Sequence, residues 1–112
     1  MTECLFCAIA RHEKEAAYQY EDESFVAFDD LYPKAAVHIL LVPKKHIHSV
    51  DNVEEGDLAL MGSMILVAKE IARQKGLDGY QLHFNVGKNG GQVIDHIHLH
   101  IMGGKDIRGI TI

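Results

Sequence analysis

Apolar residues recur along the chain with two different periods, and each period predicts a different kind of element. Short apolar or alternating runs predict strands, because successive side chains of a strand point to opposite faces. These runs are residues 17–20, 25–28, 36–42 and 80–86. Four polar residues separate the first two runs, which predicts a hairpin. Pro43 ends the third run, since proline removes a hydrogen bond from a central ladder.

A helical period predicts a short helix over residues 5–11 and a long helix over residues 54–75. Acidic residues near the start of the long segment and Gly76 at its end suit the helix dipole and a C-terminal cap. Two apolar stripes run along this helix, with centres about 100° apart. The first is Leu58, Met61, Ile65, Ala68 and Ala72, and the second is Leu60, Met64, Val67 and Ile71. One stripe is enough to pack a helix on a sheet, so the other predicts a partner subunit or, alternatively, a covering loop.

The order of these elements, with short connections between strands, predicts an α+β class with antiparallel pairing. The length of 112 residues suits one core, so we expect a single domain over 1–112. The net charge is −5 and no run of Lys or Arg is long enough to follow a phosphate backbone, which disfavours a nucleic-acid partner. The apolar stretches are too short for a membrane helix and the N-terminus lacks a secretory pattern, so we expect a cytoplasmic location.

The segment from His96 to Ile101 alternates three imidazoles with three aliphatic side chains. As a strand, it would bury the aliphatic residues and project the histidines from the other face. Three interpretations compete: a solvated strand face, a three-histidine metal site, and a nucleophilic or acid–base array. Chance alternation is improbable, and the outer histidines would lie about 13 Å apart along a strand, which seldom lets all three reach one ion. The array is therefore favoured, with a central histidine as nucleophile.

A glycine-rich loop over residues 87–92 directly precedes the histidine run. Backbone N–H groups at glycines can form an anion cradle, although such a loop alone is more often a simple hairpin turn. Its position before three histidines favours a phosphate site, to which Asn85 can add a side-chain donor. Attack of a histidine on phosphorus would give a phospho- or nucleotidyl-histidine that water then opens.

These residues resemble the histidine triad (HIT) superfamily, and the resemblance covers nearly the whole chain. The pattern His-x-His-x-His-x-x, with apolar residues at each x, matches residues 96–102. Other matching positions are residues 25–30, 38–47 and 90–92, Asn85, and the closing Gly103-Gly104. The Pro-Lys-Lys-His-Ile segment and the triad followed by Gly-Gly are similar to the Hint branch, whose members hydrolyse purine nucleoside phosphoramidates.

The resemblance implies a fold, an assembly and catalytic roles. The fold would be a five-stranded antiparallel sheet with one long and one short helix, forming a homodimer through the 54–75 helix and a strand. His98 would take the nucleotidyl group, and His100 would contact the phosphate and assist the leaving group. His96 and His38 would support and orient the array.

The resemblance also implies a nucleotide site. Asn85, Gly91 and Gln92 would bind phosphate, and Asp30 would accept hydrogen bonds from the ribose hydroxyls. The base pocket would be Leu5, Phe6, Ile9, Phe28 and Leu31, for which plain core packing is the alternative.

Two features depart from the Hint pattern. Val93 follows Gln92 where that branch has a serine whose hydroxyl lies near the leaving group, so other leaving groups come into consideration. The C-terminal tail, residues 107–112, lacks the aromatic and proline-rich sequence that tunes substrate choice in animal Hint proteins.

Cys4 and Cys7 lie close together, and metal binding or redox chemistry explains them better than a structural disulfide does. Two cysteines alone do not complete a tetrahedral zinc site. Similar bacterial HIT proteins complete it with two histidines, and the matching positions are His46 and His96, so the resemblance implies a structural zinc. Two buried thiols on a short helix are the alternative. A ligand role for His96 would compete with a hydrogen bond from His96 to His38.

Together these features predict a nucleotide-binding hydrolase or nucleotidyl transferase that cleaves purine nucleoside 5′-phosphoramidates to AMP through a nucleotidyl-histidine. The alternatives are a dinucleoside polyphosphate hydrolase, as in the related Fhit branch, and a nucleotide-binding regulatory protein with vestigial activity. The expected partners are an AMP-like nucleotide and a second copy of the chain, with no nucleic acid, no membrane and no organic cofactor. No role is expected for His12, His48 or His83.

Overall fold

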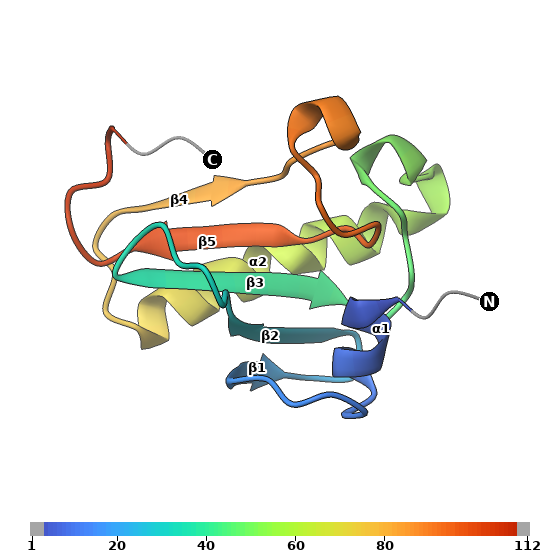
Figure 1. The fold of residues 1–112 in the computed structure, drawn as a ribbon, viewed down its shortest axis with the longest axis horizontal. Coiled ribbons are helices and arrows are strands. Elements are labelled where there is room, and N and C mark those ends of the chain that lie inside the picture. The colour runs from blue at the N-terminus through green and yellow to red at the C-terminus, as the bar shows by residue number, and fades with distance from the viewer. Residues whose placement is uncertain (1–3, 110–112) are drawn as a thin grey trace.

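A five-stranded antiparallel sheet, in the order β1-β2-β3-β5-β4, forms the centre of the molecule in the computed structural model, which describes residues 4–109 (Figure 1). The strands are β1 Tyr18–Glu21, β2 Phe25–Asp29, β3 Val37–Pro43, β4 Tyr80–His83 and β5 Leu99–Gly103. The helices are α1 Leu5–Ala10 and α2 Leu58–Gln74, and single 3₁₀ turns occupy Val50–Asn52, Glu55–Asp57 and Lys88–Gly90. The predicted α+β class, the long helix and the short helix are confirmed. Residues 110–112 of the tail discussed above lie outside the described residues.

The two faces of the sheet are covered by different helices. The long helix α2 covers one face and the short helix α1 lies over one end of the other (Figure 1). Strand β2 shows the period of two that this requires: Phe25 and Ala27 join the core under α2, whereas Val26 and Phe28 pack with α1. Each sheet face therefore buries its own apolar cluster.

The same alternation in β5 sets the direction of its histidine. Leu99 and Ile101 are buried in the core under α2. His100, between them, is paired with Leu40 of β3 and His83 of β4 and projects on the α1 side. Burial of the aliphatic residues thus determines which face carries the imidazole.

The histidine segment enters the sheet later than the alternation predicts. β5 begins at Leu99, so His96 and His98 precede the ladder. The His96 amide donates to the Ile94 carbonyl at 2.9 Å, and the Ile97 amide to the Ile47 carbonyl at 2.7 Å. These bonds replace ladder pairing just before the strand, and the ring of His96 still lies on the α1 side, 6.1 Å from the ring of Phe6.

Helix α2 faces the sheet mainly with the second of its two stripes. Met64 and Ile71 are buried there, with Leu60 and Val67 packed beside them. From the first stripe Ala68 and Ala72 are also buried, whereas Leu58 remains 73% exposed and Ile65 46% exposed. The helix therefore keeps an uncovered apolar surface within the described chain.

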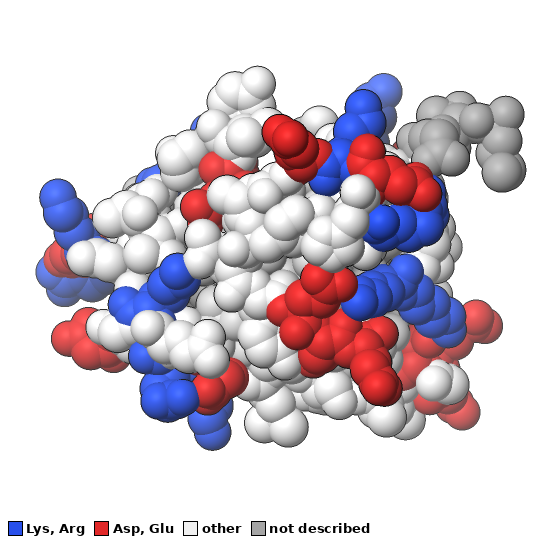
Figure 2. Space-filling view, turned by 90° about the horizontal axis from the view of Figure 1, so that it is seen from below, with Lys and Arg blue, Asp and Glu red and all other residues white. Residues whose placement is uncertain are grey.

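Charged side chains of both signs are interspersed over the face drawn in Figure 2. Blue and red residues alternate there, so that face offers no continuous basic track. In the described part of the chain, no helix is long and apolar enough to cross a membrane.

Candidate active site

A cavity of about 430 Å³ opens on the α1 side of the sheet, and it gathers most of the predicted site residues. The predicted residues that line it are Leu5, Phe6, Ile9, Phe28, Asp30, Leu31, His38, Asn85, Gly91, His98 and His100. They come from α1, from β2 and the loop after it, from the start of β3, from the segment between β4 and β5, and from β5 itself. His96 and Gln92 do not line it. The cavity thus has an apolar wall from α1 and β2 and a polar floor of histidines.

His98 is held with one ring nitrogen free to react. Its Nδ1 lies 2.7 Å from the His96 carbonyl oxygen. Because a carbonyl can only accept, Nδ1 carries the hydrogen and Nε2 of the neutral ring has the lone pair. Burial lowers the pKa of His98, although the same hydrogen bond and the charge of Asp30 oppose that shift. The edge-to-face contact with Phe6, at 5.1 Å between ring centroids, holds the ring from the side.

A chain of hydrogen bonds also sets the hydrogen on His100. The Lys34 amide donates to His38 Nδ1 at 2.9 Å, so Nε2 of a neutral His38 carries the hydrogen. That nitrogen lies 2.9 Å from Nδ1 of His100, which therefore accepts and keeps its own hydrogen on Nε2. Asp30 Oδ2 lies 3.4 Å from His38 Nε2 and adds a negative charge beside the pair. The cavity therefore contains an acceptor on His98 and a donor on His100.

Burial keeps these rings neutral. It lowers the pKa of His100 to about 4, with His98 and His38 acting in the same direction and Asp30 against it. Burial also lowers the pKa of His38, opposed by the charge of Asp30. A neutral His98 can attack an electrophile at neutral pH without first losing a proton.

The ligand atoms of Asp30, His38 and His100 lie within 4.8 Å of one another, close enough to suggest a metal site. The hydrogen bond from the Lys34 amide argues against one, because it leaves the hydrogen of His38 on the nitrogen that would have to bind the ion. These three side chains therefore fix the tautomers of the two histidines through hydrogen bonds and are poorly suited to bind a cation.

The glycine-rich loop is stabilised by internal hydrogen bonds. The amides of Gly90, Gly91 and Gln92 donate within the loop, to the carbonyls of Gly87 or Lys88 at 3.0 to 3.1 Å. Gln92 is buried, and its side-chain nitrogen donates to the carbonyls of His48 and Ile94. Its side-chain oxygen accepts from the Gly87 amide at 2.9 Å. Gln92 therefore holds the loop in shape and does not present a donor to the cavity.

Two other positions of this loop region face the cavity. Gly91 has φ +88°, a left-handed conformation that suits glycine, and a Cβ there would lie 3.5 Å from Asn85 Nδ2. Val93 lines the cavity with a side chain that is 86% exposed, and among the described residues none accepts from its backbone N–H. In the sequence, Val93 attracts attention only because it lacks a hydroxyl. Its backbone N–H at the cavity becomes visible only in the structure.

His96 belongs to a second cluster, which it forms with Cys4, Cys7 and His46. Its Nδ1 lies 3.3 Å from Cys4 Sγ, 3.5 Å from Cys7 Sγ and 3.2 Å from His46 Nδ1. Its Nε2 donates to the Pro43 carbonyl at 2.8 Å, so the Nδ1 that faces the cysteines bears a lone pair. Among the described residues, no hydrogen bond joins His96 to His38, which pairs with His100 instead.

The Cys4, Cys7, His46 and His96 cluster fits a zinc ion. Its four ligand atoms lie within 4.8 Å of one another. Ordinary zinc–sulfur and zinc–nitrogen bonds in a tetrahedron place neighbouring ligand atoms about 3.3 to 3.8 Å apart, close to the separations found here. The backbone carbonyl behind His96 is the outer partner that metal-bound imidazoles usually have.

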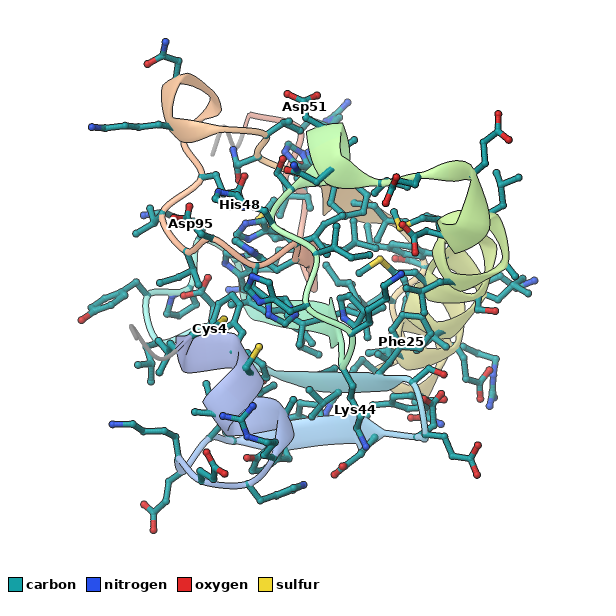
Figure 3. The ribbon with its side chains drawn as sticks, turned by 90° about the vertical axis from the view of Figure 1, so that its right-hand side faces the viewer. Cys4, Phe25, Lys44, His48, Asp51 and Asp95 are labelled. Atoms are coloured by element: carbon teal, nitrogen blue, oxygen red, sulfur yellow. The ribbon has the colours of Figure 1, made fainter. Side chains whose placement is uncertain are left out.

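The three histidines without a predicted role lie outside both clusters. His12 pairs with Glu21 at 2.7 Å, and His48 with Asp95 at 3.2 Å. His83 contacts a glutamine of its own strand. Figure 3 shows His48 and Asp95 side by side, on loops above the N-terminal end of α1 where Cys4 lies.

Comparison with known proteins identifies the family. A family model described as "Scavenger mRNA decapping enzyme C-term binding" matches residues 3–109. Protein HitA of Neisseria gonorrhoeae is 44% identical over 104 residues, which cover 92% of this chain and 97% of HitA. The crystal structure of a HIT family hydrolase from Legionella pneumophila Philadelphia 1 superposes with a TM-score of 0.93 at 42% identity, covering 96% of this chain and 97% of that one.

A zinc-bound histidine triad family protein from Mycobacterium smegmatis superposes with a TM-score of 0.81 at 30% identity, covering 97% of this chain and 80% of that one. The chain belongs to the histidine triad superfamily, and its fold is the HIT fold.

Proposed function

We propose that the protein is a nucleotide hydrolase that cleaves purine nucleoside 5′-phosphoramidates to AMP through a covalent nucleotidyl-histidine at His98. The observation that carries this proposal is the pair of opposed ring nitrogens in one cavity. The lone pair on His98 Nε2 and the N–H on His100 Nε2 follow from the partners of the opposite ring nitrogens. The hydrolase name of the Legionella relative agrees with this chemistry.

The reaction takes place in two displacements. In the first, His98 Nε2 bonds to phosphorus and the phosphorus–nitrogen bond breaks; the leaving amine takes a proton from solvent while the N–H of neutral His100 donates a hydrogen bond beside it. In the second, water attacks phosphorus and the bond to His98 breaks. The proton released from that water replaces the one taken by the amine, so His98 and His100 return to their starting states. Splitting one difficult displacement into two is the gain from a covalent intermediate.

The rest of the cavity suits a nucleotide. The Asn85 side chain, the Val93 amide and His100 would donate hydrogen bonds to the phosphoryl oxygens. Asp30 would accept from the ribose hydroxyls, as a carboxylate facing a diol can. The base would lie against the apolar wall formed by Leu5, Phe6, Ile9, Phe28 and Leu31.

A fluorogenic adenosine 5′-phosphoramidate tests the activity. Wild type should turn it over, and His98→Ala should not. Equal turnover by the two proteins would refute the mechanism. Faster turnover of a diadenosine polyphosphate would favour the alternative hydrolase, and AMP binding without turnover of either substrate would favour a regulatory protein.

We propose in addition that the cysteine cluster holds a structural zinc. When bound, zinc would supply cross-linking of α1 to the loops that carry His46 and His96, without touching the substrate. The zinc-bound relative from Mycobacterium supports the assignment. Metal analysis of protein purified without a His tag should find about one zinc per chain. Under a tenth of an equivalent would contradict it.

The protein is also proposed to be a homodimer through the helix predicted over 54–75. Leu58, Ile65 and Leu66 form the uncovered apolar surface of α2, and Leu66 is 64% exposed. Light scattering on wild type should give twice the mass of one chain, and Leu66→Glu should shift it toward the monomer. A monomeric wild type at micromolar concentration would refute this assembly.

A further inference from the structure

His96 belongs to the metal cluster, and its backbone carbonyl also accepts a hydrogen bond from the nucleophile His98. We infer that His96 is a positioning residue, through which metal bound by Cys4, Cys7 and His46 fixes the ring of His98 and so sets the rate of the chemical step. This inference depends on the proposed function. It assigns the cluster a part in turnover beyond holding the fold together.

The first connection passes through the backbone. The ring of His96 is fully buried and is held at both nitrogens, by the Pro43 carbonyl on one side and by the cluster on the other. The carbonyl of the same residue accepts the 2.7 Å hydrogen bond that keeps the hydrogen of His98 on Nδ1. A ring anchored in this way leaves its own backbone little freedom to turn, so the carbonyl stays aimed at His98.

The second connection passes through α1. Cys4 is the N-cap residue of this helix, and its sulfur accepts from the Cys7 amide at 3.4 Å. α1 has six residues, far fewer than an isolated helix needs to be stable in water, so its order depends on what attaches it. Its first turn is attached by the two thiols of the cluster and by the buried ring of Phe6, which packs on Phe28.

Phe6 lies between the two cysteines in sequence and transmits this attachment to the active site. Its ring contacts His98 edge to face at 5.1 Å between centroids, with an interplanar angle of 83°. The same ring lies 6.1 Å from that of His96. When the thiols are fixed, Phe6 holds the ring of His98 from the side while the His96 carbonyl holds its Nδ1.

Release of the metal should loosen both connections. His46 Nδ1 and His96 Nδ1 are 3.2 Å apart, with sulfur atoms at similar distances, and without a cation these electron-rich atoms have reason to separate. If the His96 carbonyl then turns away, the hydrogen of His98 can move to Nε2. That tautomer has no lone pair facing the cavity and cannot attack phosphorus.

Two exposed histidines in one loop make a matched pair of variants. His46→Ala removes a ligand whose ring contacts His96 and the Cys7 sulfur. His48→Ala removes an imidazole that pairs with Asp95, away from the cluster (Figure 3). His46→Cys restores a four-ligand set of a kind that binds zinc well. All three are compared with zinc-loaded and chelator-treated wild type, at a temperature below every melting point.

Relative to zinc-loaded wild type, the kcat of His46→Ala and of chelated wild type should fall by about 10- to 100-fold, the order of loss found when a functional histidine loses the group that orients it. His48→Ala and zinc-loaded His46→Cys should keep the wild-type value. Two-bond ¹H–¹⁵N spectra of the imidazoles should show His98 with its hydrogen on Nδ1 in zinc-loaded protein and on both nitrogens after chelation. A purely structural zinc would lower the melting temperature and leave kcat and the tautomer unchanged.

The inference is overturned if wild type binds no metal, if chelation leaves kcat and the His98 spectrum unchanged, or if His48→Ala loses as much kcat as His46→Ala. If zinc-loaded wild type turns over no adenosine phosphoramidate, the proposed function fails separately. The tautomer spectrum then decides alone: a shift on chelation supports the positioning role, and no shift refutes it.

Discussion

The burial of His100 should make folding stability depend on pH in a measurable way. Its folded pKa is lowered to about 4, mainly by burial, whereas an unfolded histidine titrates near about 6.5. Between these values the unfolded chain binds a proton that the folded chain does not. Stability therefore falls as the pH drops below about 6.5 and continues to fall until about pH 4.

The size of the effect follows from the two pKa values. Between pH 7.5 and pH 5 the unfolded state gains about 2 kcal/mol from protonation of this one imidazole, and the folded state gains almost nothing. His100→Gln removes the titrating group and leaves the other histidines in place. The wild type should therefore lose about 2 kcal/mol more than the variant over this range.

Urea unfolding of both proteins at pH 7.5, 6 and 5, with zinc present throughout, measures this difference. Taking the difference between proteins removes the contribution of groups that titrate equally in both. Parallel losses of stability in wild type and His100→Gln would show that His100 is already charged or well solvated in the folded protein. The donor tautomer assigned to His100 would then lose its basis.

Other substitutions test the loops and the sheet. Gln92→Leu should destabilise the protein by about 1–3 kcal/mol in urea unfolding, because the Gly87 amide and the His48 and Ile94 carbonyls lose their hydrogen-bond partner. A loss below about 0.5 kcal/mol would contradict the role of Gln92 in holding the loop. Asn85→Asp should weaken AMP binding in calorimetry about 10- to 100-fold, since a donor near the phosphate becomes a negative charge; unchanged affinity would remove Asn85 from the phosphate site. Gly103→Ala should cost about 1–3 kcal/mol, because its Cβ would lie 2.9 Å from Leu77 Cδ1 and 3.1 Å from the Gly79 carbonyl oxygen. An unchanged urea midpoint would show that these neighbours of β5 can move aside.

Several elements follow from local pattern. The alternation at Leu99 and Ile101 predicts a buried strand with His100 on the opposite face, and the structure agrees. The period of the long helix likewise predicts α2 and its two apolar surfaces. These predictions succeed because burial of one face is enough to determine the direction of every second or every third to fourth side chain.

The partners of His96 could not be read from the same alternation. The pattern puts it on the same face as His98 and His100, and its ring does lie on the α1 side beside Phe6, although β5 begins only at Leu99. The partners Cys4 and His46 come from distant parts of the sequence. Resemblance to a family suggested the ligand set, whereas spacing alone did not.

The sequence by itself determined which histidines are available and that a strand would project the three of the triad from the face opposite its aliphatic residues. Only the tertiary structure decided what each ring nitrogen does. The His96 carbonyl assigns the lone pair to His98 Nε2, and the Lys34 amide, acting through His38, assigns the hydrogen to His100 Nε2. The physical reason is that a tautomer depends on the group that meets the opposite nitrogen, and the fold brings that group from another part of the chain.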